Sequence, residues 1–360
     1  MEASNSPDPG RKQRITLEDV ARDARVSRST VSLVLRGSSA PSRTTQETVI
    51  RSIQKLGYVY NRTAANLRTR TTHTIGLIMP NIENRFFAQL TVGVEAEFDQ
   101  SNKIVMLANT SENLLRQRKA IAMMLEHNVD GVLICPVPGS RAEDVQPLFG
   151  GVTPAVSYVR RVTGVPCRFV ANDNVGGATI AVDHLLRLGH TRIGFVGGYP
   201  DTSAYHERLS GFKNALRRAG VPLQRRYVFP GENSFNGGCQ VAARVAGMHS
   251  RPTAVFCFND MTALGFMRGV DNAGLISGRD MAVVGFDDIQ EAAMWQPPLS
   301  TVSCEPETVG REAARLLMRV IEGRSPDGEE VLLPVELIER SSSAGYSGAY
   351  SRGWLSSSVW

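Results

Sequence analysis

Residues 15–36, ITLEDVARDARVSRSTVSLVLR, contain two short amphipathic segments with almost no connection between them. Thr16 is placed to cap the first helix, with Asp19 three residues later, and Ser27 is placed to cap the second. Apolar residues recur at helical spacing in both segments, which leaves only residues 24–26 to turn the chain. Two helices that are too short to bury a core alone and that cross at a tight turn predict a helix-turn-helix.

The second helix of such a motif can enter the major groove of DNA. Its outer face carries Arg28, Ser29, Ser32 and Leu33. Arginine can bind the edge of a guanine, serine can pair with any base, and leucine can touch a thymine methyl group. For a segment of this size alone, an ordinary helical hairpin inside a larger domain is the alternative interpretation.

The distribution of charge favours DNA binding over a plain hairpin. Residues 11–72 contain thirteen Lys or Arg and four Asp or Glu, a net charge of +9. The first ten residues carry −2, so residues 73–360 also carry −2 within the total of +5. A cationic helical module on a slightly acidic body is what binding to a phosphate backbone requires.

The composition is that of a globular chain, because 360 residues with 42% hydrophobic content can form a small domain and a large one. No apolar run approaches the roughly 18 residues of a membrane span, and the N-terminus lacks the apolar core of a signal peptide. We therefore expect a cytoplasmic protein that makes no membrane contact. The five cysteines form no CxxC pair and the six histidines form no HExxH motif, so we expect reduced thiols, no metal and no cofactor.

A third helix completes the N-terminal module. It is predicted to begin at Thr44, where Thr44 and Glu47 match a capping box, and to end at Gly57. The segment that follows has no core-forming stripe and contains one large apolar residue, Leu67, among arginines. It can be a basic linker or a short helix.

From Ile75 onward, short β-rich apolar runs alternate with amphipathic helices. Repeated βα units predict parallel sheets with helices on both faces, and ligands in such folds bind at the carboxyl ends of the strands. There are too many units for one sheet, so we expect an α/β core of two similar parallel-sheet lobes, ending in a single strand near residues 331–337. The predicted organisation is a disordered lead at residues 1–13, an all-α helix-turn-helix headpiece at 14–60, a hinge at 61–73, the two-lobed core at 74–340 and a disordered tail at 341–360.

Several longer motifs match a known family in the same order along the chain. They are TLEDVARDARVSRSTVSLVL (16–35), ANLRTRTTHTIGLIMPNIENRFFAQL (65–90), NDNVGGATIAVDHLLRLGHTRIGFVGG (172–198), ERLSGF (207–212), FNDMTALGFMRG (258–269) and VVGFDD (283–288). Through them the chain, from Arg14 to about Arg340, resembles the lactose/galactose-repressor family of bacterial transcription regulators. The resemblance implies a homodimer whose headpieces read a near-palindromic operator. It also implies a periplasmic-binding-protein-like core that takes a small effector between its lobes.

The resemblance assigns DNA contacts residue by residue. It places Arg28, Ser29 and Leu33 at base-reading positions, and Leu67 at the leucine that wedges into the minor groove. A hinge helix this short is expected to fold only when two copies meet on DNA. The residues that we predict to contact DNA are Thr16, Ser27, Arg28, Ser29, Thr30, Ser32, Leu33, Asn61, Ala64, Leu67 and Arg68.

The resemblance also points to an effector site of aromatic, carboxylate, amide and guanidinium side chains, which suits a sugar or similar polyol. Three of its residues have other interpretations, with Asp173 as a helix cap, Asp287 as a turn acid and Phe235 as a core residue. The predicted effector-binding residues are Phe86, Phe87, Asp173, Arg208, Phe235, Asn259, Asp260 and Asp287.

The chain departs from the family pattern at three places. Arg25 stands where glycine is common, so we expect a positive φ there, at a cost of about 1 kcal/mol. Arg85 stands where proline is common, and its charge leaves open an acidic effector such as a sugar acid. The absence of C-terminal heptads argues against a tetramer built on a terminal coiled coil.

Two other classes of protein fit the sequence less well. An enzyme is disfavoured because the chain has no GxSxG, P-loop or GxGxxG motif. A sugar-binding transport protein would share the core fold, but it would not need the basic headpiece. We therefore expect a repressor that a sugar or sugar-acid inducer releases from its operator. The same architecture can instead use a ligand such as a purine as a corepressor.

Overall fold

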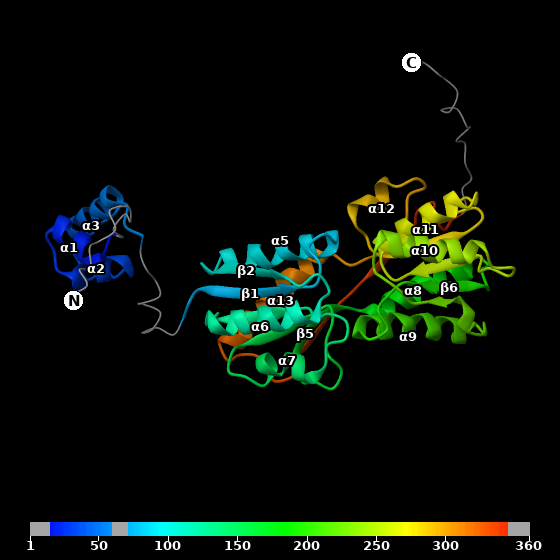
Figure 1. Cartoon of the computed structure of the whole chain (residues 1–360), viewed down its shortest axis with the longest axis horizontal. Helices are drawn as coiled ribbons and strands as arrows, with labels where there is room; N and C mark the ends of the chain where they lie inside the picture. The colour runs from blue at the N-terminus through cyan, green and yellow to red at the C-terminus, as the bar shows by residue number, and fades with distance from the viewer. Residues whose placement is uncertain (1–14, 60–70, 345–360) are drawn as a thin grey trace, which may run out of the picture. The chain divides into compact units, whose positions relative to one another are not determined.

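The structure is a computed structural model that describes residues 15–59 and 71–344. The chain divides into two compact units, residues 1–72 and residues 73–360, and each is described by itself (Figure 1). Among the helices of the described residues, none is long and apolar enough to cross a membrane.

The headpiece unit contains three helices, α1 (Leu17–Ala24), α2 (Arg28–Leu35) and α3 (Arg43–Leu56). The capping box predicted at α1 is confirmed, because the Asp19 N–H donates to Thr16 Oγ1 and the Thr16 N–H donates to Asp19 Oδ2 at 2.9 Å. The predicted cap at Ser27 is confirmed by a 3.1 Å hydrogen bond from the Thr30 N–H. Arg25 has the expected positive φ, 53°. The turn predicted between the first two helices is therefore present.

The predicted start of α3 is wrong. Ser42, and not Thr44, caps this helix by accepting a hydrogen bond from the Thr45 N–H at 3.3 Å. Ser42 has a non-helical backbone, with φ −59° and ψ 154°, so the helix begins at Arg43 and Thr44 lies inside its first turn. Glu47 is then too far along the helix to reach the cap, and it lies 3.4 Å from Arg43 instead. The three helices close on a small core of Val20, Ala21, Ala24, Val31 and Val49.

Lobe 1 of the core is built on a six-stranded parallel sheet in the order β11-β5-β4-β3-β1-β2. Helices α5 (Arg85–Asp99) and α13 (Pro306–Ile321) pack on one face of the sheet, and α6 (Leu114–Glu126) and α7 (Ala142–Phe149) pack on the other (Figure 1). The strands are β1 (Thr74–Met79), β2 (Ile104–Asn109), β3 (Gly131–Ile134), β4 (Ala155–Tyr158), β5 (Arg168–Asn172) and β11 (Glu330–Leu333).

Lobe 2 repeats this plan with a sheet in the order β12-β10-β9-β8-β6-β7, in which only the β10–β12 pair is antiparallel. The strands are β6 (Ile193–Val196), β7 (Val228–Phe229), β8 (Ala254–Cys257), β9 (Ala282–Asp287), β10 (Ser300–Ser303) and β12 (Glu336–Ile338). The helices are α8 (Asn174–Arg187), α9 (Ser203–Arg218), the 3₁₀ turn η1 (Arg225–Tyr227), α10 (Phe235–Ala246), α11 (Asp260–Asn272) and α12 (Gln290–Met294). The expected pair of similar α/β lobes is confirmed.

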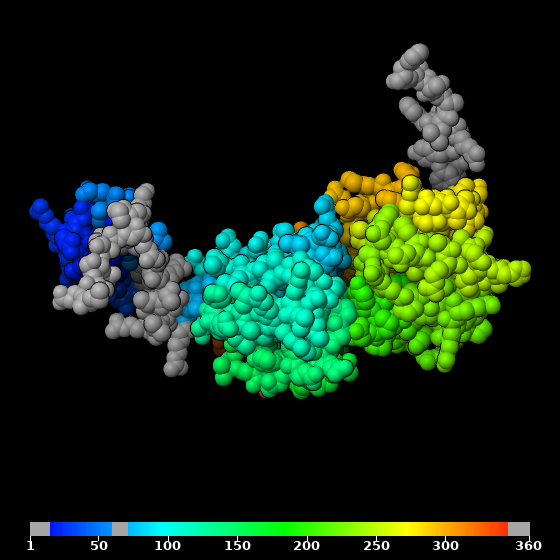
Figure 2. Space-filling view, viewed as in Figure 1, coloured from blue at the N-terminus to red at the C-terminus, as the bar shows by residue number. Residues whose placement is uncertain are grey.

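The chain crosses between the lobes three times, from β5 to α8, from β10 to α13 and from β11 to β12. Figure 2 shows the two lobes as adjoining masses. The single final strand expected near residues 331–337 is wrong, because it is split at Pro334. Proline has no N–H to donate to a ladder. The first half therefore joins β5 in lobe 1 and the second half joins β10 in lobe 2.

The expectation of a disordered tail is wrong for residues 341–344. Ser342 and Ser343 are buried. The Ser300 N–H donates to Ser342 Oγ at 2.8 Å, and Ser342 Oγ donates to the Val283 carbonyl at 2.6 Å. These hydrogen bonds satisfy backbone groups of two neighbouring strands, and they hold the segment in place without large apolar side chains. The rest of the predicted tail lies outside the described residues.

We expect His184 to contribute stability to the core that is lost as the pH drops below about 6.5. His184 is buried, with Nε2 2.7 Å from Ser343 Oγ and Nδ1 3.2 Å from Glu339. Burial lowers the pKa of His184, although Glu339 raises it. The unfolded chain therefore takes up a proton at a higher pH than the folded chain, and that proton favours unfolding.

The measurement is the free energy of unfolding against pH for the parent chain and for His184→Gln. Between pH 6.5 and 5, the variant should lose less stability than the parent chain as the pH falls. His249→Gln, at an exposed histidine, is the matched control and should keep the parent slope. An unchanged slope in His184→Gln would contradict this account.

Candidate functional site

The outer face of α2 carries the predicted base-reading residues. Arg28 and Ser29 are exposed, and Ser32 and Leu33 are half-buried. The Arg28 side chain makes no hydrogen bond or ion pair with any other described residue. Leu33 and Thr30 line a hollow between α2 and the start of α3. An exposed guanidinium at the first turn of the second helix is in the position from which this motif reads bases.

Two predicted DNA contacts also act as helix caps. The Thr16 hydroxyl donates to Asp19 at 2.6 Å. The Ser27 hydroxyl lies 2.7 Å from the Ser29 hydroxyl and 2.8 Å from that of Thr30. These bonds hold the helix N-termini in place, and helix N-termini are common phosphate-binding positions on DNA. The other predicted contacts, Asn61, Ala64, Leu67 and Arg68, lie outside the described residues.

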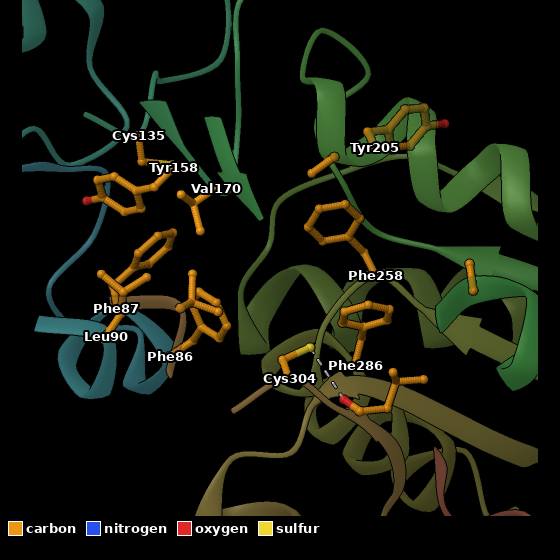
Figure 3. Packing of buried hydrophobic residues seen from close by; sticks show 14 of the residues in the cluster. Phe86, Phe87, Leu90, Cys135, Tyr158, Val170, Tyr205, Phe258, Phe286 and Cys304 are labelled. Carbon is orange, nitrogen blue, oxygen red and sulfur yellow. Dashed lines mark hydrogen bonds between the residues drawn. The ribbon is translucent and has the colours of Figure 1, made fainter. Parts of the chain in front are cut away.

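A cavity lies between lobe 1 and lobe 2, where the strands of both sheets end. We call it the interlobe cavity. Figure 3 shows Phe86 and Phe87 on the lobe 1 side and Phe258 on the lobe 2 side. The location is the one that parallel α/β folds use for ligands. The residues that line the interlobe cavity are Asn81, Asn84, Phe86, Phe87, Glu112, Val159, Arg160, Tyr199, Ala204, Arg208, Asn233, Ser234, Phe258, Asn259 and Asp287.

Arg208 is a buried cation of this cavity. Its Nε donates to Asn174 Oδ1 at 2.8 Å, and its Nη1 donates to the Phe258 carbonyl. Its guanidinium carbon lies 3.6 Å from the centre of the Phe286 ring and 4.5 Å from that of Phe258. Burial lowers the pKa of Arg208, and the charge of Asp287 opposes this shift. The guanidinium is therefore a fixed hydrogen-bond donor, oriented before any ligand arrives.

Asp287 ends β9 and faces Arg208, with Oδ1 3.8 Å from Nη2. Burial raises the pKa of Asp287 to about 7, although Arg208 lowers it. The φ of Asp287 is 119°, in a region that side chains rarely adopt, and strain of this kind concentrates at functional sites. The lining position and the strained backbone favour a binding role over that of a simple turn acid.

A second buried ion pair lines the interlobe cavity, and the sequence did not predict it. Arg160 follows β4 and is 5% exposed. Its Nη1 and Nη2 donate to the two carboxylate oxygens of Glu112 at 2.9 and 3.1 Å, which is the bidentate geometry of a strong pair. Burial lowers the pKa of Arg160, but the charge of Glu112 outweighs it and the net shift is upward. Arg160 therefore remains charged.

The side chains of two predicted effector residues do not reach the interlobe cavity. The Asp173 side chain caps α8 by accepting a hydrogen bond from the Gly176 N–H at 2.8 Å. The Phe235 ring packs edge-on against Trp295, with 6.1 Å between the ring centres, beside the outer core of lobe 2. Neither residue lines the interlobe cavity. Both occupy the alternative roles that the sequence left open.

Asp260 is also absent from the lining, because it is fully buried behind the cavity. It accepts hydrogen bonds from the Thr301 hydroxyl at 2.5 Å and from the Ile289 N–H at 2.9 Å. Burial and the charge of Asp287 raise the pKa of Asp260. Its bond to Ile289 holds the loop that follows Asp287, so it positions that residue. Among the described residues, no group of three or more His, Cys, Asp or Glu side chains could hold a metal ion.

The polar lining residues that the sequence analysis missed share one signal. Each follows a strand and precedes or opens a helix or turn, as Asp287 does. A polar side chain at the carboxyl end of a buried strand was the available clue. These residues are Asn81, Asn84, Glu112, Arg160, Tyr199, Asn233 and Ser234.

Arg85 does not line the cavity. Its Nη2 donates to Gln290 Oε1 at 2.7 Å, and its Nε lies 3.9 Å from Glu291. The contact joins α5 of lobe 1 to α12 of lobe 2. Because a carboxylate already accompanies Arg85, its charge gives less support to an acidic effector than the sequence suggested.

Two family models match the chain. Residues 16–61 match "Bacterial regulatory proteins, lacI family", and residues 182–343 match "Periplasmic binding protein-like domain". The chain is 31% identical over 326 residues to the HTH-type transcriptional repressor PurR of Vibrio vulnificus, covering 90% of this chain and 97% of that protein. It is 30% identical over 332 residues to catabolite control protein A of Priestia megaterium, covering 91% and 99%.

Solved structures agree with this assignment. The lac repressor dimer bound to operator and the anti-inducer ONPF matches with a TM-score of 0.82 and 28% identity, over 92% of this chain and 99% of that one. The transcriptional regulator CelR in complex with cellobiose matches with a TM-score of 0.70 and 31% identity, over 92% and 100%. Together with the helix-turn-helix and the two-lobed core, these similarities show what the chain is. It is a member of the lacI family of bacterial regulatory proteins and a DNA-binding transcriptional repressor.

Proposed function

We propose that this repressor is released from its operator when a sugar or sugar acid binds in the interlobe cavity. The observation that carries the proposal is a pair of buried ion pairs in the cavity lining. Arg208 pairs with Asp287, and Arg160 pairs with Glu112. The rings of Phe86 and Phe258 line the same cavity. Fixed donors and acceptors pointing in several directions suit a ring that carries many hydroxyl groups, and aromatic faces suit its C–H side. CelR, bound to cellobiose in its solved structure, supports a sugar.

A purine corepressor that tightens operator binding is the second candidate. The similarity to PurR repressors favours it, because their name points to purines. The aromatic side chains favour it less. Phe86 and Phe87 meet edge to face at 88°, so they offer no parallel pair of faces for a flat base.

The proposal includes a homodimer on a near-palindromic operator. One surface of lobe 1 supports it, because apolar side chains are exposed on the edge strand β2 and on α6 next to it. Ile104 is 69% exposed and Leu115 is 72% exposed, and Leu107 and Met123 are exposed as well. An apolar edge strand that is left open is a site for pairing with another chain. A second copy of this chain is the proposed occupant.

The segment between the headpiece and the core is proposed to transmit the signal. Residues 61–73 would form a hinge in which Asn61, Ala64, Leu67 and Arg68 contact DNA, with Leu67 inserted between base steps. Ligand binding would change the arrangement of the lobes and with it the spacing of the two hinges. A coupling of this type is typically worth about 1–3 kcal/mol. Action on operator DNA implies a cytoplasmic location, and the basic headpiece favours this role over sugar transport.

A thermal-shift screen of the purified full-length protein tests the proposal. Sugars, sugar acids and nucleobases are added separately, and a ligand that binds only the folded core at about 100 times its Kd should raise the melting temperature by roughly 5 °C. Each hit is then tested for its effect on operator affinity. A sugar or sugar acid that weakens operator binding supports the proposal. A response to nucleobases alone, with tighter operator binding, supports the corepressor alternative instead.

A further inference from the structure

A second cavity adjoins the interlobe cavity and is larger, at about 310 Å³ against about 90 Å³. We call it the annex. Lobe 1 forms most of its wall through the loop after β3 and the loop after β4, and lobe 2 contributes Asp201 and Thr202 at the start of α9. The residues that line the annex are Pro136, Val137, Ser140, Arg141, Ala142, Arg160, Arg161, Val162, Thr163, Asp201 and Thr202.

Arg160 belongs to both cavities. It stands directly after Val159, whose φ of 60° is rare for a β-branched residue and turns the chain sharply at the end of β4. Glu112 accepts one hydrogen bond from each terminal nitrogen of Arg160. A guanidinium has five N–H donors, so this pairing leaves further donors for a ligand at the boundary between the two cavities.

The charges of the annex favour a neutral ligand group. Arg160 is neutralised by Glu112, and Arg161 Nη1 lies 3.0 Å from Glu330. Asp201 adds a negative charge to the lining, so the cations there do not form an open anion site. Arg141, the third arginine of the lining, is exposed and has its Nη1 4.0 Å from Glu143. The remaining polar side chains carry hydroxyl groups, which can pair with uncharged hydroxyl groups of a ligand; they are Ser140, Thr163 and Thr202. The Ser140 and Thr202 hydroxyls already donate to backbone carbonyls, so they offer a ligand acceptor oxygens.

From these features we propose that the effector has two linked sugar rings, as in a disaccharide or a glycoside. The first ring binds in the interlobe cavity, the second ring binds in the annex, and Arg160 contacts the linkage between them. This inference rests on the proposed sugar effector. It adds that the effector is two rings long and carries no charge. Because the annex takes its wall from both lobes, a ligand that spans the two cavities contacts lobe 1 and lobe 2 at both ends.

Isothermal titration calorimetry on the full-length protein tests this inference. The probes are cellobiose, maltose, lactose and melibiose, together with glucose and galactose as their single rings. One disaccharide should bind at least ten times more tightly than either hexose. Thr163→Trp, at an exposed loop position, should fill the annex and bring the Kd of that disaccharide to within about threefold of the hexose Kd. Thr191→Trp, at an exposed threonine far from both linings, is the matched control and should preserve the preference.

Two outcomes would overturn the inference, and they differ in what they leave standing. If a hexose binds as tightly as every disaccharide and Thr163→Trp changes neither Kd, the annex is not part of the site, while the sugar effector stands. If neither class of sugar binds, the proposed effector class falls together with the inference.

Discussion

Replacing Asp287 with asparagine is expected to give a repressor that binds its operator but no longer leaves it when ligand is added. The buried carboxylate is the acceptor beside Arg208, at 3.8 Å, and it lies in the cavity lining. Asparagine has nearly the same shape as the aspartate that already adopts this backbone, so the fold should persist. Loss of a hydrogen bond to a charged group costs about 1.5–3 kcal/mol, or roughly 10- to 150-fold in ligand affinity.

The measurement is operator affinity with and without ligand, by fluorescence anisotropy, together with the ligand Kd. Asp288→Asn is the matched control, because this neighbouring acid bonds to Arg340 at 2.8 Å and does not line the cavity. It should respond to ligand as the parent does. A normal response in Asp287→Asn would remove Asp287 from the effector site.

Replacing Arg28 with alanine is expected to weaken binding to the specific operator by about 5- to 150-fold, which corresponds to the 1–3 kcal/mol of a good base contact. Arg28 is exposed at the first turn of α2, without a partner among the described residues. A base contact discriminates between sequences, whereas a phosphate contact weakens all DNA binding alike. Binding to a scrambled duplex should therefore change much less than binding to the operator.

Both affinities are measured at one fixed salt concentration, because the electrostatic part of the affinity depends on salt. Arg22→Ala is the control, since Arg22 is an exposed arginine of α1 that lies 3.4 Å from Asp19. It should leave the ratio of specific to nonspecific affinity unchanged. An equal loss on both duplexes for Arg28→Ala would indicate a phosphate contact and not base reading.

The sequence by itself determined the local structure and the class of protein. The caps at Thr16 and Ser27, the left-handed Arg25 and the alternation of strands and helices were readable because each depends on residues close together in the chain. The cap of α3 was misplaced by two residues, since Ser42 and Thr44 both resemble caps and only the backbone distinguishes them.

Only the tertiary structure decided which polar residues face the interlobe cavity. Asp173 follows a buried strand and Asp287 ends one, yet Asp173 caps its own helix and Asp287 faces Arg208 from a strained backbone. Arg160 was missed because its partner, Glu112, is 48 residues away in the sequence. The split of the last strand at Pro334 and the burial of Ser342 likewise depend on which strands lie beside them. The spacing of residues along the chain carries no information about contacts between residues that are far apart in sequence. The interlobe cavity is built from such contacts.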